Sequence, residues 1–378
     1  MPIPMLDLKR EYEFMKADID AAIRKCLDHQ KWILGPEVKE LEEKAAAYLE
    51  TKHCIGASSG TDALVLALRA LAIKRKGEEY FTRNDKIITT PFTFTATGDA
   101  ILRSGATPVF VDIHPKTFNI DPVLVSRCLK EMPGVVGIIP VHLYGRSCEM
   151  DAIMDIARQH NLFVIEDVAQ AFGASWNGKK AGTIGDCGAY SFFPSKNLGG
   201  FGDGGMVSTN DPGLADLVRM LLKHGGKDKY NVDHIGYNAR LDTLQAAVLA
   251  AKLKHIDHFN NQRRAIADSY SKAIAGATGI VTPQSVPGHV FHQYTIRVEG
   301  GRRDALQKIL KEAGVDTMIY YPVTLNKMKV FAARSETFNG LPEAERAVSE
   351  VLSLPIEPLF SAPEIQLIYE TVKKSAAQ

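Results

Sequence analysis

Cysteine is scarce in this chain, and the cysteines that are present form no ligand or disulfide pattern. Cys26, Cys54, Cys128, Cys148 and Cys187 are scattered over 378 residues without a CxxC pair. Disulfide-stapled domains and zinc sites use closely and regularly spaced cysteines. The sequence therefore predicts reduced thiols, as in a cytosolic protein, and no metal site.

Long apolar runs and an excess of one charge are also missing. No stretch reaches the roughly 18 apolar residues of a membrane span, and the first residues lack the basic and apolar segments of a signal peptide. Lysine and arginine number 45 against 44 aspartates and glutamates, a net charge of +1. This balance argues against nucleic acid or a membrane surface as a partner.

The chain does contain a regular alternation of helical and strand-like segments. Two amphipathic helical patterns occupy the first sixty residues, and from Ile55 short apolar runs alternate with helical patterns. The runs are continuous, as expected for strands covered on both faces. The pattern predicts an α/β domain over 1–253, with a mainly parallel central sheet and helices on both faces.

The character of the sequence changes after about residue 254. A helical pattern over 240–276 is expected to bridge two domains, and a strand is expected over 315–323. Mixed short strands and helices predict a small α+β domain over 254–378.

The charged stretch Ile73–Asp85 interrupts the earlier alternation, and its mixed acids and bases are typical of a surface excursion.

Two segments could hold a ligand, although each has an ordinary structural explanation. A Ser/Gly/Thr turn at 58–61 leads into an apolar helix, whose unpaired N–H groups and dipole favour a phosphate. Thr61 could equally be a simple N-cap. Asp167 ends an apolar strand pattern, where open α/β sheets bind ligands. A capping or salt-bridged aspartate would give the same pattern.

A third segment places Lys196 after aromatic residues and before five glycines. The glycines follow the lysine, so the GxxxxGK[ST] phosphate loop is absent. The aromatics indicate packed surroundings, where a lysine's pKa falls and Schiff-base chemistry becomes accessible. A phosphate-holding helix start, a strand-end aspartate and a later lysine, in this order, are the parts of a pyridoxal-phosphate site.

The ordered motifs resemble the DegT/DnrJ/StrS nucleotide-sugar aminotransferases, which are fold-type I pyridoxal-phosphate enzymes with an aspartate-aminotransferase-like fold. The resemblance covers nearly the whole chain. It implies that Lys196 binds the cofactor covalently and moves protons, that Asp167 pairs with the pyridine nitrogen, and that Gln170 bonds the phenolic oxygen. The matching segments include "SSGTDALVLAL", "TPFTFTAT", "VIEDVAQAFG", "SFFPSKNLGGFGDGG" and "GYNARLDTLQAA".

The same resemblance implies further cofactor contacts. Gly60, Thr61 and Ser191 correspond to phosphate holders within one subunit. Phe94 corresponds to an aromatic that stacks on the pyridine ring, with a core aromatic as the alternative. Asn238 corresponds to a residue that reaches the cofactor phosphate of a second subunit, which implies a homodimer with two shared sites.

The resemblance also implies residues on the substrate side. Arg240 corresponds to an arginine near the sugar or amino donor, with an interface salt bridge as the alternative, and Tyr320 is a further candidate. Asn326 and Lys327 lie in "VTLNK", which is similar to a segment of enzymes that aminate C3 of UDP-linked 3-keto-N-acetyl sugars or their uronic acids. A solvated Lys327 is the alternative. Thr324 departs from the usual proline.

Taken together, the resemblance implies transfer of an amino group from L-glutamate to a keto group, at C3, of a nucleotide-linked sugar. Pyridoxal 5'-phosphate would be the cofactor, with pyridoxamine 5'-phosphate as its second form. The setting would be cytoplasmic amino-sugar biosynthesis, for example for lipopolysaccharide. Relatives with histidine at the position of Lys196 are dehydratases, so the lysine favours transamination. Dehydration of the sugar, amination of a 4-keto sugar and a regulatory role without turnover are three further hypotheses; intact Lys196, Asp167 and Gln170 argue against the regulatory role.

Overall fold

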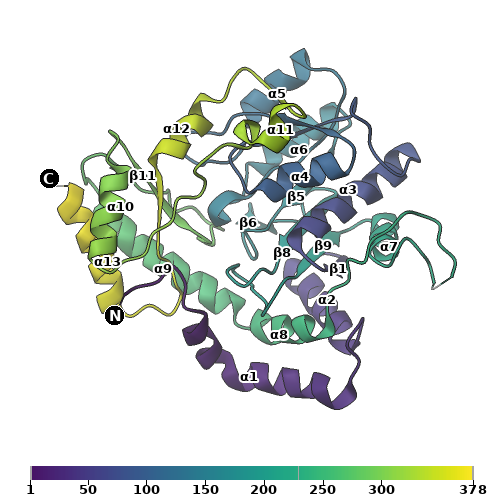
Figure 1. Cartoon of the computed structure of the whole chain (residues 1–378), viewed down its shortest axis with the longest axis horizontal. Coiled ribbons are helices and arrows are strands. Elements are labelled where there is room, and N and C mark those ends of the chain that lie inside the picture. Colours follow the sequence, from purple (N-terminus) through teal and green to yellow (C-terminus); the bar gives the residue numbers. More distant parts are fainter. Residues whose placement is uncertain (1, 229, 377–378) are drawn as a thin grey trace.

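The computed structural model describes residues 2–228 and 230–376, and its centre is an eight-stranded sheet (Figure 1). The strand order is β1-β9-β8-β5-β4-β2-β3-β12. Neighbours from β8 to β12 run parallel, whereas β9 is antiparallel to β1 and β8. The expected mainly parallel sheet is confirmed. Its strands are β1 (His53–Ala57), β2 (Lys86–Thr89), β3 (Thr107–Phe110), β4 (Val135–Ile138), β5 (Phe163–Asp167), β8 (Cys187–Ser191), β9 (Gly205–Thr209) and β12 (Glu336–Thr337).

Helices cover both faces of this sheet, as predicted. Successive strand residues point to opposite sides, so a continuous apolar strand presents apolar side chains to both layers of helices. In β5, Phe163 and Ile165 join an apolar cluster with α3 and α7, whereas Val164 joins another with α5 and α6. The central strands are therefore buried on both sides, which explains their unbroken apolar runs. The flanking helices are α3 (Gly60–Lys76), α4 (Thr95–Arg103), α5 (Pro122–Glu131), α6 (Met150–Gln159) and α7 (Pro212–Leu221).

A layer of longer helices lies beside this domain (Figure 1). α1 (Leu8–His29) and α2 (Pro36–Leu49) both pack on α8 (Thr243–Leu253). The expected single helix over 240–276 is wrong, because α9 (Ile256–Ile274) starts after a break at Lys254 and His255. α8 buries its surface against α1 and α2, whereas the second half of α9 joins the C-terminal core. The apolar periodicity continues through the break and does not reveal it.

The C-terminal part has its own small antiparallel sheet, β10 (Ile280–Val281), β11 (Tyr294–Val298) and β13 (Val351–Leu354). The expected strand over 315–323 is wrong, since this segment forms only isolated bridges, Val315 to Ile3 and Met318 to Ser353. Its backbone pairs with two different partners instead of one strand. The domain division at 253 stays a prediction. β12 belongs to the part of the chain after this division, yet it pairs with β3 in the large sheet. The remaining elements are η1 (Leu143–Gly145), β6 (Ser175–Trp176), β7 (Lys179–Lys180), α10 (Arg303–Glu312), η2 (Leu325–Lys327), α11 (Lys329–Ala332), α12 (Pro342–Glu350) and α13 (Ala362–Ala376).

The five cysteines are all buried and unbonded to one another. In the part of the chain that the structure describes, no helix is both long and apolar enough to cross a membrane.

Candidate active site

The first turn of α3 meets the ends of β8 and β9 in one polar corner. Ser59 is the N-cap, with its Oγ 3.0 Å from the Asp62 N–H that donates to it, so the alternative of Thr61 as N-cap is wrong. The N–H groups of Gly60 and Thr61 have no partner among the described residues. A Cβ on Gly60 would lie 2.6 Å from the Cβ of Ser191, so the two backbones approach closely. Gly60, Thr61 and Ser191 thus share the positive end of a helix, which favours an anion.

Asp167 lies at the carboxyl end of β5, where it pairs with Ala189 of β8. The Thr97 hydroxyl donates to Asp167 Oδ2 over 2.8 Å, and the Ala169 N–H donates to Oδ1 over 3.1 Å. Burial raises the pKa of the Asp167 carboxyl, although both hydrogen bonds and the nearby Lys196 charge act in the opposite direction. A cationic group placed against Asp167 would relieve this cost.

The neighbouring Glu166 points to the other side of the strand and is already satisfied. Its Oε2 lies 2.9 Å from His142 Nε2 and accepts from the Gly182 N–H at 2.8 Å. Its Oε1 accepts from the N–H groups of Ile184 and Gly185, at 2.7 and 2.8 Å. Glu166 therefore organises the turn before β8, whereas Asp167 faces the candidate site.

Lys196 lies in the turn after β8, where its N–H donates to the Phe193 carbonyl over 2.8 Å. Burial lowers the pKa of its ammonium group to about 8, while the Asp167 charge acts in the opposite direction. Its Nζ has no hydrogen bond or ion pair with any described residue. A lysine that is partly neutral near physiological pH can act as nucleophile and base.

Gln170 and Phe94 border the same region. The Tyr144 N–H donates to Gln170 Oε1, and Gln170 Nε2 donates to Tyr321 Oη, both over 2.8 Å. An amide nitrogen carries two hydrogens, so one remains for a ligand. The Phe94 side chain is 58% exposed, so the alternative of a core aromatic is wrong. Its ring centroid lies 6.5 Å from that of Tyr321.

Sequence reasoning missed two residues of this site, Thr97 and Tyr321. Thr97 follows Phe94 by three residues in the first turn of α4, so a helix starting there would have placed the two together. Tyr321 contacts Gln170 from the far end of the chain. No local pattern links residues that are so distant in sequence.

The substrate-side candidates have fewer partners. Arg240 forms a β-bridge with Ala57, and its buried Nε has no hydrogen-bond partner within the described chain. It lines a cavity with Ser58, Ser59 and Asp203, next to the α3 N-terminus. Asn238 is exposed, and its backbone bridges to that of Lys223.

The 320–327 segment lies against the start of α4, because the Leu325 N–H donates to the Pro91 carbonyl over 2.9 Å. Asn326 Oδ1 is buried and finds no hydrogen-bond donor in the described structure. Lys327 is 54% exposed and forms an ion pair with Glu345 over 2.8 Å. The Tyr320 carbonyl accepts from the Tyr144 hydroxyl.

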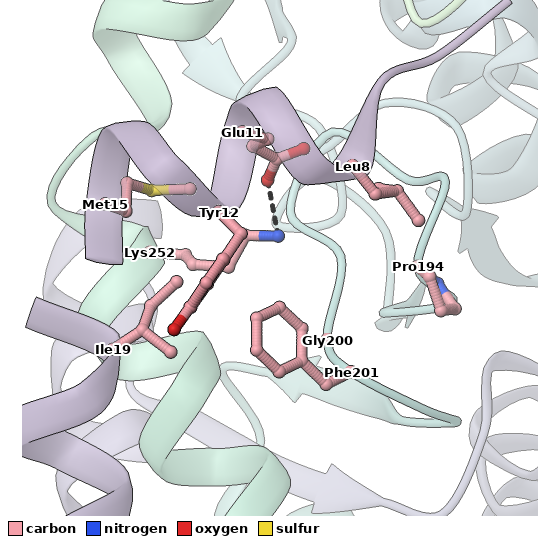
Figure 2. Close-up of a pocket in the computed structure, with 9 residues that line it drawn as sticks. All are labelled: Leu8, Glu11, Tyr12, Met15, Ile19, Pro194, Gly200, Phe201 and Lys252. Carbon is pink, nitrogen blue, oxygen red and sulfur yellow. Dashed lines mark ion pairs between the residues drawn. The ribbon is translucent and has the colours of Figure 1, made fainter.

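A separate apolar pocket of about 200 Å³ lies between α1 and the loop that follows Lys196 (Figure 2). Tyr12 and Met15 line it from the helix, and Phe201 from the loop. Its charged residues, Glu11 and Lys252, form a buried ion pair of 2.5 Å. Because these two charges pair with each other, neither is free to bind or react with a ligand.

One potential metal-ligand group lies elsewhere among the described residues, at Cys26, His29 and Glu37, whose ligand atoms lie within 4.8 Å of one another. His29 Nδ1 accepts from the Lys31 N–H over 3.0 Å, so Nε2 carries the proton and donates to Glu37. Lys25 Nζ lies 3.3 Å from the same carboxylate. The cluster is hydrogen-bonded and charge-paired without an ion.

The donor set fits pyridoxal phosphate. The α3 N-terminus with Ser191 suits a phosphate, and the buried Asp167 suits a protonated ring nitrogen. Lys196 suits a covalent anchor, and the exposed Phe94 ring offers a stacking face.

Comparisons with known proteins identify the family of the chain. Residues 13–373 match the model of the DegT/DnrJ/EryC1/StrS aminotransferase family. A pleiotropic regulatory protein of Geobacillus stearothermophilus is 47% identical, over 98% of both chains. A dTDP-3-amino-3,4,6-trideoxy-alpha-D-glucose transaminase of Streptomyces venezuelae is 41% identical, over 99% of this chain and 96% of its own. A UDP-N-acetyl-3-dehydro-alpha-D-glucosamine 3-aminotransferase of Acidithiobacillus ferrooxidans is 40% identical, over 99% and 98%.

Two solved structures give the same result. S. venezuelae DesV in complex with a ketimine intermediate superposes with a TM-score of 0.93 at 41% identity, over 100% of this chain and 99% of that one. NtdA from Bacillus subtilis with bound cofactor PMP gives 0.87 at 31% identity, over 96% and 82%. Fold and site define a pyridoxal-phosphate-dependent aminotransferase. The chain belongs to the DegT/DnrJ/EryC1/StrS aminotransferase family.

Proposed function

We propose that the protein transfers an amino group from L-glutamate to the C3 keto group of a UDP-linked sugar, in cytoplasmic amino-sugar biosynthesis such as that for lipopolysaccharide. The observation that carries the proposal is the end-to-end similarity to relatives named for 3-amino and 3-dehydro sugars on dTDP and UDP. The "LNK" segment at 325–327 supports UDP as the nucleotide, because it resembles a segment of enzymes that act on UDP-linked 3-keto sugars.

Pyridoxal phosphate, when bound, carries the amino group and withdraws electrons from the reacting carbon. Lys196 would hold it covalently and, once released, move the proton between cofactor and substrate carbon. A pKa of about 8 suits this role, because an acid–base group works best when its pKa lies near the working pH.

Asp167 would pair with the protonated ring nitrogen and stabilise the charge that develops on the ring. Thr97 and the Ala169 N–H hold its carboxylate in place. Gln170, fixed by Tyr144 and Tyr321, would donate its remaining hydrogen to the phenolic oxygen.

The phosphate would bind where Gly60, Thr61 and Ser191 meet. Asn238 of a second copy would complete that contact, in a homodimer with two shared sites. Exposed apolar side chains that precede the Asn238–Arg240 segment in the chain, or that lie at or next to Ile33, which bridges to Asp242, support self-association. They are Trp32, Ile33, Leu34, Val232 and Ile235.

The sugar and the amino donor would bind between Arg240 and the 320–327 segment. Arg240 Nε and Asn326 Oδ1 are buried polar atoms without partners in the described chain. Because such atoms are costly, a substrate that supplies an acceptor for the arginine and a donor for the amide would be stabilised there. Tyr320 and Lys327 are further candidates on the same segment.

A substrate panel tests the proposal. The loaded enzyme is mixed with isotope-labelled L-glutamate and 3-keto or 4-keto sugars on UDP, dTDP and GDP, and products are identified by mass spectrometry. We expect a labelled amino sugar, 2-oxoglutarate, and the highest kcat/KM for a UDP-linked 3-keto sugar. Preference for a 4-keto sugar or another nucleotide would overturn the substrate assignment, and a product that has only lost water would overturn transamination. Lys196→Ala serves as the inactive control.

A further inference from the structure

A buried chain of hydrogen bonds starts at the residue that follows Lys196. Asn197 Nδ2 donates to Asn260 Oδ1 over 2.8 Å and to the Val290 carbonyl over 3.3 Å. Asn197 Oδ1 lies 3.0 Å from His292 Nδ1. Asn197, Asn260 and His292 are all buried. Such side-chain networks, when fully satisfied, fix a single local geometry.

The partners determine the direction of each bond. Because Asn197 Nδ2 faces two acceptors, Asn197 Oδ1 must accept, and His292 Nδ1 therefore carries the proton. His292 Nε2 is then an acceptor for Gln293 Nε2 at 3.4 Å. Burial and the charges of Lys196 and Arg263 hold the pKa of His292 well below its usual range. His292 is therefore a neutral donor to Asn197.

The network connects the lysine loop to three other parts of the fold. Asn260 belongs to α9 and donates through Nδ2 to the Phe172 carbonyl over 3.2 Å, just after Gln170. His292 precedes β11. Lys196 Nζ itself has no bonding partner within the described residues, so nothing at the tip of its side chain fixes its position. Its placement depends on its backbone, which Asn197 holds.

We propose that His292 is a positioning residue for Lys196, which it holds toward Asp167 by fixing Asn197. The residue acts through the loop and touches neither cofactor nor substrate in this role. Loss of its Nδ1 donor would leave Asn197 Oδ1 buried and unpaired, and the loop would open to restore hydration.

Two nearly isosteric replacements separate donation from packing. His292→Asn places an amide N–H close to the original Nδ1 position, whereas His292→Leu fills a similar volume without a donor. The pKa of Lys196 is measured in the cofactor-free protein from the pH dependence of its acylation, followed by mass spectrometry of the Lys196 peptide. We expect the Leu variant to raise this pKa from about 8 toward an ordinary lysine value, because an opened loop hydrates the ammonium group. We expect the Asn variant to leave it near 8.

Kinetics of the loaded enzyme give a second readout. We expect His292→Leu to lower kcat by about tenfold to 100-fold with little change in the sugar KM, as misplacement of a catalytic group does, and His292→Asn to recover most of the rate. If His292→Leu does not fold, His292→Gln replaces it, because its longer side chain carries the amide past Asn197.

A stability control is Tyr270→Phe, which removes a buried hydrogen bond to the Pro355 carbonyl in the C-terminal core. It should lower thermal stability and leave both the Lys196 pKa and kcat unchanged. The proposal is overturned if the Leu and Asn variants at 292 have the same Lys196 pKa and kcat. It is also overturned if Tyr270→Phe changes these quantities as much as His292→Leu does.

Discussion

Asp167 and Gln170 on the cofactor side differ from the substrate-side candidates in how completely the chain satisfies their polar groups. Asp167 and Gln170 each accept or donate two hydrogen bonds from elements of the same chain. By contrast, the buried atoms Arg240 Nε and Asn326 Oδ1 lack partners in the described residues, and Asn238 is exposed.

The difference indicates which half is pre-organised. A rigid, hydrogen-bonded cofactor side can place charges before reaction, which is the most effective form of electrostatic stabilisation. Unpaired buried groups are costly in a single chain, so we infer that the other half is completed by substrate and a second subunit. Substitutions on the two sides should therefore have different effects.

The largest effect is expected for Lys196→Ala, on the pre-organised side. Without the amine there is no covalent anchor and no proton carrier, and kcat should fall by at least about 10⁴-fold, the upper range for a positioned acid–base group. Initial rates and the absorbance of bound cofactor measure this. Lys196→Arg keeps the positive charge and should be equally inactive. A wild-type rate in either variant would contradict the assignment.

Asp167→Asn should lower kcat by about 10² to 10³-fold, as loss of a key electrostatic group does, while stabilising the cofactor-free protein near neutral pH. The pKa of this carboxyl is raised on folding. Its ionisation therefore costs stability, a cost that is absent below the unfolded-state pKa and grows as pH rises toward the folded-state pKa. Thermal melts of the cofactor-free protein from pH 4 to 8 follow the gain.

Glu166→Gln is the matched control on the adjacent residue. Its carboxylate accepts three backbone N–H groups at its two oxygens, and an amide nitrogen cannot accept from them. At Asp167 one of the two donors is the Thr97 hydroxyl, which can turn to accept from an amide. The Glu166→Gln variant should be destabilised by about 1–3 kcal/mol, the usual result for buried groups left unsatisfied. Equal stability changes for the two variants would remove the contrast between the neighbouring carboxylates.

A complementation experiment tests whether the substrate side is shared between subunits. Lys196→Ala and Arg240→Ala chains, each poorly active alone, are mixed, unfolded and refolded together. If each site takes Lys196 from one chain and Arg240 from the other, mixed dimers contain one intact site, and about one quarter of wild-type activity returns for random pairing. Activity that stays at the mean of the two parents would show that each chain contains its own complete site.

The smallest effects are expected in the 325–327 segment. Asn326→Ala should raise the sugar KM by about tenfold, the value of one hydrogen bond to a polar group, with little loss of stability because its Oδ1 has no partner to lose. Lys327→Ala removes an exposed ion pair to Glu345 and should change stability by less than about 1 kcal/mol. The sugar KM should then change less than in Asn326→Ala. The reverse order would assign the dominant contact to Lys327.

Local sequence patterns correctly predicted the layers of the fold, because burial on both faces leaves continuous apolar runs and amphipathic helices leave a regular period. They failed at Lys254 and at 315–323. In both places the chain changes its packing partner without a change in apolar period, so the prediction extended one element too far.

The order of the candidate cofactor-binding groups can be read from the sequence alone: a capped helix start at 59–61, a strand that ends in two carboxylates, and a lysine at 196. The tertiary structure gives the physical difference between Glu166 and Asp167, because alternate strand residues face opposite ways and the turn at 182–185 satisfies Glu166. The tertiary structure also places Thr97 beside Asp167, Tyr321 beside Gln170 and His292 beside Asn197. Their distant contacts depend on how layers pack, and no local pattern of polarity encodes that packing.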